Sequence, residues 1–293
     1  MRKVSARVHA CKVTAAGVDW LTCTGSTILS REELWRHGLR LLHAGKREGE
    51  NATAWHANGY VGWKGPHFGF GSRGDSVCLQ LSSVQADEEW QECIGASENV
   101  TRLDLAVDCQ FDPPMPSISL DIYRHAGHRP SLNGRPPKLT LYTDTDGGST
   151  LYVGARASEN FGRLYDKGVK EKVAPRGTWW RWEAELKGRV AVATSEGLRS
   201  SDDYRVAIVR EVAHWFGRRT GHTYTSSHTM GTLVGPRQPT TIDQKLKWLA
   251  TGVRPTVTAL IELVGVERVL NVLGLPPQSA VNIGVRKHSL KEA

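Results

Sequence analysis

Three short segments between residues 101 and 188 concentrate side chains that could act together on a phosphate ester. Each segment alternates polar and apolar residues, which is typical of a strand with one face in the core. Carboxylates from separate strands can hold Mg²⁺ or Mn²⁺ through oxygen ligands, and the bound ion polarises a phosphoryl oxygen. The candidate metal ligands are Asp104, Asp108, Glu183 and Glu185.

The middle segment carries a tyrosine between two basic residues. In RLYDK, the side chains of Arg163, Tyr165 and Lys167 alternate and are expected to point to the same side of a strand. A tyrosine hydroxyl has an ordinary pKa of about 10, and a metal ion or a nearby cation favours the more nucleophilic phenolate. Attack on a DNA phosphate would leave a phosphotyrosine and release a 3′-hydroxyl, while Arg163 and Lys167 bind the phosphodiester.

The same pattern has a second interpretation. An antiparallel sheet with one hydrated face also alternates charged and apolar residues, and a tyrosine between arginine and lysine is ordinary there. On the pattern alone, a solvated sheet face therefore stays open beside the catalytic interpretation.

The elements that must position these residues read as strands first and helices last. Residues 18–25 are expected to form a strand, and a helix follows in which Ser30 and Glu33 match a capping box. The glycine-rich and aromatic-rich stretch 58–83 is typical of a strand meander. Later strands are expected at 101–109, 138–143, 150–155, 161–168 and 178–188, and a helix that ends at a glycine is expected at 202–221.

This order predicts an α+β protein with an antiparallel catalytic sheet, packed with helices and followed by a helical C-terminal region. We predict a catalytic domain at 1–190, in which 1–100 is the N-terminal part and 101–190 is the motif-bearing sheet. A helix and linker at 191–240 and a C-terminal helical region at 241–293 are expected to follow.

The composition favours a polyanionic partner. Lysine and arginine number 38 against 30 acidic residues, which gives a formal charge of +8. That excess is zero over the first hundred residues, +3 over the second hundred and +5 over the rest. Five scattered cysteines without C-x-x-C spacing predict reduced thiols and a cytoplasmic location. No apolar run is long enough to predict a membrane span.

Three motifs in a fixed order resemble the replication initiation factor family. They are Arg102-x-Asp104 with Asp108, then Tyr152 to Ser158 followed by Arg163-x-Tyr165-Asp166-Lys167-Gly168, then Arg181-x-Glu183. The family includes rolling-circle Rep proteins of plasmids and filamentous phages and relaxases of some integrative conjugative elements. The segments VDWLTCTG and LKWLATGVRPTV also look like family segments, so the resemblance covers most of the chain.

The resemblance implies a ferredoxin-like or palm-like core and a metal-dependent strand transferase with one catalytic tyrosine and no His-hydrophobic-His triplet. Such a protein nicks one DNA strand at a replication origin, stays bound to the 5′ end and leaves a 3′-hydroxyl primer. Carried over by position, Tyr165 is the nucleophile, Asp104 and Glu183 are the first metal ligands, Asp108 and Glu185 are further ones, and Arg163 and Lys167 position the phosphate. Ala155 stands where the family often has serine.

Other residues keep alternatives open. Tyr152 is the rival nucleophile, although its apolar neighbours favour packing in the sheet. His125 and His128 lie three apart in a predicted loop and could join a metal site, although a pair in a loop is more often solvated.

DNA contacts beyond the candidate site are predicted at four arginines. Two lie in the motifs, and two lie at the end of a predicted helix, next to a Thr-rich and Ser-rich link. The helix-end pair could contact phosphates or could form a surface that only keeps the protein soluble. They are Arg156, Arg181, Arg218 and Arg219.

Three functions therefore remain to be separated. The first is origin nicking and joining, for rolling-circle replication or for conjugative transfer. The second is a non-catalytic DNA-binding regulator on the same fold, and the third is a two-metal nuclease that uses water. The predicted partner is origin DNA, single-stranded or supercoiled, and a host helicase and a second copy of the chain are further candidates.

Overall fold

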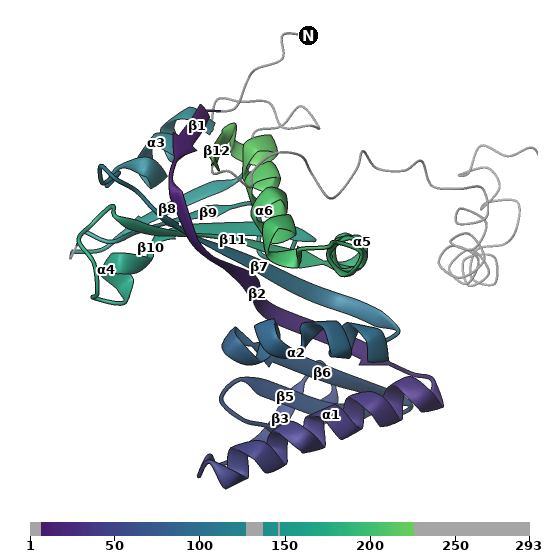
Figure 1. The fold of residues 1–293 in the computed structure, drawn as a ribbon. Helices are drawn as coiled ribbons and strands as arrows, with labels where there is room; N and C mark the ends of the chain where they lie inside the picture. Colours follow the sequence, from purple (N-terminus) through teal and green to yellow (C-terminus); the bar gives the residue numbers. More distant parts are fainter. Residues whose placement is uncertain (1–6, 127–136, 146, 226–293) are drawn as a thin grey trace, which may run out of the picture. The chain divides into compact units, whose positions relative to one another are not determined.

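The computed structural model describes residues 7–126, 137–145 and 147–225. In this part of the chain, one antiparallel sheet of ten strands forms the framework (Figure 1). Across the sheet the order is β3 (Thr53–Ala57), β4 (Tyr60–Lys64), β5 (Phe68–Arg73), β6 (Ser76–Ser82), β2 (Lys12–Gly25), β7 (Asn99–Gln110), β11 (Trp179–Lys187), β10 (Asn160–Asp166), β9 (Ser149–Val153) and β8 (Leu139–Thr143). A separate parallel pair joins β1 (Arg7–Ala10) to β12 (His222–Thr225).

The sheet has two halves with the same strand order. Read outward from the centre, the first half is β2, β6, β5, β4, β3 and the second is β7, β11, β10, β9, β8. The long central strands β2 and β7 pair with each other and join the halves. The described helices are α1 (Ile28–Arg47), α2 (Ser83–Ala96), α3 (Ile118–Ala126), α4 (Lys167–Lys170), α5 (Gly188–Arg199) and α6 (Tyr204–Thr220).

One face of the sheet is the core. On β7 the side chains of Leu103, Leu105 and Val107 are fully buried, as are Trp180 and Trp182 on β11. They pack in one cluster with residues of α1, α2, α5 and α6. The residues between them in sequence therefore point to the opposite face, which carries the polar residues of the predicted site.

These observations confirm the α+β fold with an antiparallel sheet and helices. The expected alternation on β7 and β11 is observed, and β8 and β9 pair as an antiparallel hairpin. The domain boundaries stay a prediction, and the expected helices after residue 240 lie outside the described residues. Among the helices that are described, none is long and apolar enough to cross a membrane.

Several local expectations were wrong. The capping box fails because Ser30 lies inside the first turn of α1, where Thr27 is the N-cap and accepts a hydrogen bond from the Ser30 amide. Helices α2 and α5 were not predicted from the sequence. His125 lies in the last turn of α3 rather than in a loop, and its partner His128 lies outside the described residues.

The start of α1 is held by a carboxylate from the loop before β7. Glu98 accepts hydrogen bonds from the Ser26 hydroxyl at 2.6 Å, the Ser26 amide at 2.9 Å and the Thr27 amide at 2.9 Å. These bonds, led by the one from the Ser26 side chain, lower the pKa of Glu98 to about 2. A carboxylate whose pKa is lower in the folded state stabilises the fold above its unfolded pKa and loses that effect as the pH falls.

We therefore expect Glu98→Gln to lower the melting temperature at pH 7, with the difference from wild type shrinking as the pH falls from about 4.5 towards 2. Calorimetry of both proteins across this pH range checks the prediction. Glu88→Gln on α2, which is also exposed, serves as the matched control. A difference that stays constant between pH 7 and pH 2.5 would contradict it.

Candidate active site

The polar face of β7, β11 and β10 brings the predicted residues together from three neighbouring strands. In the register of β7 and β11, Asp104 lies opposite Glu185 and Asp108 lies opposite Arg181. On the other side of β11, Arg163 of β10 lies opposite Glu183 and Tyr165 lies opposite Arg181. Residues directly opposite one another share a face of the sheet, so these side chains form one cluster.

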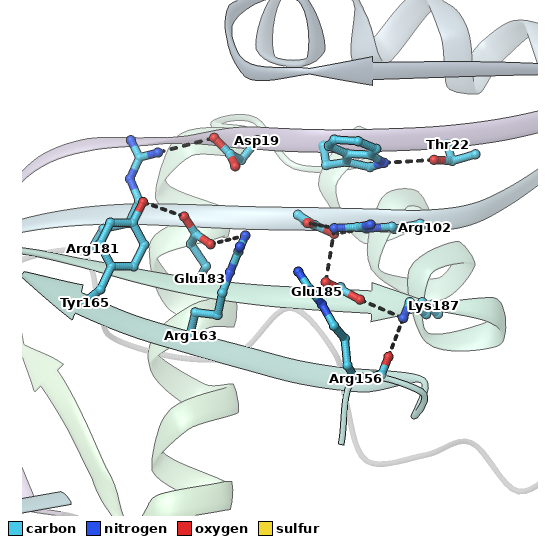
Figure 2. A network of polar contacts seen from close by, with 12 residues as sticks. Asp19, Thr22, Arg102, Arg156, Arg163, Tyr165, Arg181, Glu183, Glu185 and Lys187 are labelled. Carbon is cyan, nitrogen blue, oxygen red and sulfur yellow. Dashed lines mark hydrogen bonds and ion pairs between the residues drawn. The ribbon is translucent and has the colours of Figure 1, made fainter. Parts of the chain in front are cut away.

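Tyr165 and Glu183 are in direct contact. The Tyr165 hydroxyl donates a hydrogen bond of 2.9 Å to Glu183 Oε1 (Figure 2). The other carboxylate oxygen, Oε2, forms an ion pair with Arg163. Only 8% of Tyr165 and 4% of Glu183 is exposed. The candidate nucleophile therefore already has a proton acceptor in place.

A second group of contacts lies further along the same strands. Arg102 donates to Asp104 Oδ1 at 2.8 Å and to Asp104 Oδ2 at 2.6 Å, and its Nη2 also donates to Glu185 at 3.1 Å. The other oxygen of Glu185 lies 2.6 Å from Lys187 Nζ (Figure 2). Each buried carboxylate in this group is thus matched by a basic neighbour.

The third group contains an acidic residue that the sequence reading missed. Arg181 donates to Asp19 Oδ1 at 3.3 Å (Figure 2). It also donates to Asp108 Oδ1 at 2.6 Å, and Lys167 donates to Asp108 Oδ2 at 2.9 Å. The register of β2 against β7 shifts between Val18 and Trp20, and this bulge lets Asp19 join the polar face.

Burial and charge shift the pKa values of these groups in different directions. Burial raises the pKa of Asp104 to about 6, although Arg102 opposes the shift. Burial also raises the pKa of Glu183 despite Arg163. The pKa of Asp108 is lowered, because Arg181 and Lys167 outweigh the effect of burial. Burial and the Glu183 charge raise the pKa of Tyr165 well above its usual range.

These residues fit a divalent cation. Asp104, Asp108, Glu183 and Glu185 are between 1% and 4% exposed, and buried carboxylates are costly unless paired with positive charge. Glu183 Oε2 pairs with Arg163 and receives no further hydrogen bond. Hard oxygen donors are those that Mg²⁺ and Mn²⁺ prefer. A cation between these strands would replace contacts that arginine now makes, so Arg102 and Arg163 would have to move.

A different group of metal-type ligands lies on α1 and α2. His37, Glu89 and Cys93 place three ligand atoms within 4.8 Å of one another. Arg40 Nη2 already provides the positive charge there, since it lies 2.9 Å from His37 Nδ1 and also pairs with Glu89. Ion pairing explains this group without a metal.

The remaining predicted residues lie as follows. Lys167 begins α4 rather than continuing β10, yet its Nζ reaches Asp108. Tyr152 on β9 stacks on Phe161, with ring centroids 5.6 Å apart. This contact agrees with the expectation that Tyr152 packs in the sheet. The Arg156 carbonyl accepts a hydrogen bond from Lys187 at 2.7 Å, which places this residue beside the cluster.

Arg218 and Arg219 lie elsewhere. Both are in the last turn of α6, which packs against the core face through Phe216 and Trp182. Arg219 lies over the Trp215 ring at 5.4 Å, and Arg218 is exposed. The structure therefore does not bring these two arginines to the carboxylates, and their contact with DNA stays a prediction.

Asp166 fixes the chain directly after the candidate nucleophile. Its Oδ1 accepts from the Val169 amide at 3.1 Å at the start of α4, and its Oδ2 accepts from the Gly177 amide at 2.6 Å. Asp166→Ala leaves these amides unpaired in a buried place, so we expect a loss of about 1–3 kcal/mol in unfolding free energy. Urea unfolding measures it, and the exposed Asp202→Ala is the control. Equal stability of the two variants would refute this role.

The family model described as "Replication initiation factor" matches residues 98–272, which include β7, β10 and β11 and more than half of the chain. The chain belongs to the replication initiation factor family.

Among solved structures, a rolling-circle replication initiator protein from Geobacillus stearothermophilus is similar, with a TM-score of 0.48 and 16% identity over 70% of this chain and 85% of that one. No curated protein matches. The family assignment therefore rests on the family model.

Proposed function

We propose that this protein initiates rolling-circle replication by nicking one strand of origin DNA through Tyr165. The observation that carries the proposal is the hydrogen bond from the Tyr165 hydroxyl to Glu183, inside a cluster of buried carboxylates and arginines on one sheet face. On a solvated sheet face these carboxylates would be exposed, so their burial favours a functional site over a solvated face.

The chemistry follows from the atoms in contact. Tyr165 gives its hydroxyl proton to Glu183 Oε1, and its oxygen forms a bond to the phosphorus of the scissile phosphodiester. The bond from phosphorus to the 3′ oxygen breaks, and this oxygen takes up a proton. The products are a phosphotyrosine on the 5′ end and a free 3′-hydroxyl, and the reverse step rejoins the strand.

Each neighbouring residue has a proposed part in this step. Glu183 accepts the proton because the high pKa of Tyr165 keeps the phenol protonated at neutral pH. Arg163 and Lys167 hold the phosphate once DNA displaces their present carboxylate partners. Asp104, Glu185 and Asp108 would hold Mg²⁺ or Mn²⁺ together with Glu183, and the ion would neutralise charge on the phosphate. Asp19 is an additional candidate ligand on the same face.

The decisive experiment detects the covalent intermediate. Wild-type protein is incubated with Mn²⁺ and supercoiled DNA that carries the cognate origin, and a protein–DNA adduct that resists denaturation is sought. The proposal predicts such an adduct together with nicked circles. Nicked circles without an adduct would favour the nuclease that uses water, and DNA binding without nicking would favour the regulator. A relaxase of a conjugative element uses the same chemistry, and its cognate site would be a transfer origin.

A further inference from the structure

The polar face of the sheet does not end at the candidate site. A row of residues directly opposite one another crosses six neighbouring strands, from β4 to β11. The pairs in register are Lys64 with Gly69, Gly69 with Gln80, Gln80 with Thr22, Thr22 with Arg102, and Arg102 with Lys187. We call these six residues the cross-strand row. Because opposite residues share a face, the row continues the face that carries Tyr165.

The row has the chemistry of a surface for a polyanion. Its side chains are basic at Lys64, Arg102 and Lys187, and none of the six is acidic. Strands β3, β4, β5 and β6 contain no aspartate or glutamate on either face. Lys64 is exposed. On the described polar face, β3, β4, β5 and β6 therefore carry only positive or neutral groups, and the acidic residues lie on β2, β7 and β11 in the candidate site.

Aromatic rings lie beside the row on this part of the face. Gly69 is buried, and a Cβ there would lie 3.0 Å from the Trp55 ring, so the indole of Trp55 packs against the row at this point. Next to the row, the guanidinium of Arg73 on β5 lies 4.8 Å above the Tyr60 ring. Arg102 links the row to the site, because it contacts Asp104 and also lies 4.6 Å above the Trp20 ring.

We propose that the cross-strand row binds the single-stranded DNA that flanks the scissile phosphate, with Lys64 and Gln80 contacting its backbone. This inference rests on the proposed function for the position of the scissile phosphate. Neighbouring strands lie about 4.8 Å apart, so β4 lies about 24 Å from β11, a distance that a short single strand of several nucleotides covers. Charge and continuity with the candidate site both favour this occupant.

The test measures the binding of fluorescein-labelled dT30 by fluorescence anisotropy over a range of salt concentrations. Lys64→Gln removes one phosphate contact and is expected to reduce the salt slope by about 0.7. Gln80→Glu places a negative charge in the middle of the row at almost unchanged shape and is expected to weaken binding several-fold. The matched controls are Lys46→Gln on α1 and Gln91→Glu on α2, both exposed and outside the row.

The outcomes separate this inference from the proposed function. If the row variants bind dT30 like their controls, the row does not bind DNA, whether or not wild-type protein forms the covalent adduct. If binding weakens only in the row variants while wild-type protein forms no adduct, the row binds DNA and the proposed chemistry fails. A change in sedimentation of the row variants with unchanged dT30 binding would assign this face to a second copy of the chain and overturn the inference.

Discussion

Tyr165→Phe is expected to abolish the covalent protein–DNA adduct and to leave DNA binding unchanged. The substitution removes only the hydroxyl oxygen, which is the atom that would bond to phosphorus and which now donates to Glu183 at 2.9 Å. The ring remains in its place between the strands, so the fold is preserved. Denaturing gel electrophoresis of the reaction with labelled origin DNA measures the adduct, and anisotropy measures binding.

Tyr152→Phe is the matched control for this experiment. Tyr152 is on β9, where it lies opposite Arg163 of β10, so it is one strand further from Glu183 than Tyr165 is. Its ring packs against Phe161 and Tyr142. The Tyr152→Phe variant should therefore form as much adduct as wild-type protein. If Tyr165→Phe still forms the adduct while Tyr152→Phe does not, the nucleophile is Tyr152 and the assignment is wrong.

Glu183→Gln is expected to reduce the nicking rate by about 10²–10⁴-fold, the range that a positioned general base contributes. The amide cannot accept the Tyr165 proton, and it is a poorer cation ligand than a carboxylate. Single-turnover nicking at increasing Mn²⁺ measures both effects, because the loss of a ligand also raises the Mn²⁺ concentration needed for half-maximal rate. Affinity for single-stranded DNA should be unchanged or higher, since a negative charge is removed.

The control for this variant is Glu196→Gln, an exposed residue of α5 on the other side of the sheet. It should nick like wild type at every Mn²⁺ concentration. Because Glu183 pairs with Arg163, the variant leaves a partly buried cation without its partner, so its melting temperature must be recorded. A folded Glu183→Gln protein that nicks at the wild-type rate would exclude Glu183 from both roles.

The two halves of the sheet explain why one site is present in the described residues. Both halves follow the same strand order, but β6 lacks the carboxylates of its counterpart β11, and β2 carries only Asp19 where its counterpart β7 carries Asp104 and Asp108. The sequence shows no repeat, because the halves share topology and core alternation rather than residues. This relation became visible only from the strand order, which depends on contacts between residues far apart in the chain.

Local errors in the sequence reading have local physical causes. The capping box predicted at Ser30 and Glu33 is wrong because Thr27, three residues earlier, is the N-cap and accepts from the Ser30 amide. Glu98, distant in sequence, accepts from the amides of Ser26 and Thr27 just before the helix. Lys167 was assigned to a strand because RLYDK alternates, but Asp166 caps α4 and ends the strand there. Asp19 was missed because a β-bulge breaks the alternation that predicts faces.

The amino-acid pattern of each strand predicts which of its side chains share a face. Alternation with a period of two is a property of each strand alone, so Asp104 and Glu183 could be placed opposite the core residues Leu105 and Trp182 without knowledge of the fold. Tyr165 was placed on a strand face in the same way, and the order of motifs gave the family.

How those faces meet depends on the three-dimensional fold. It set β11 between β7 and β10, which brings Glu183 within reach of both Tyr165 and Arg163. It also matched each buried carboxylate with a basic partner and extended the polar face across β2 to Lys64. The physical reason is that strand order and register depend on hydrogen bonds and packing between distant segments, which no local pattern encodes.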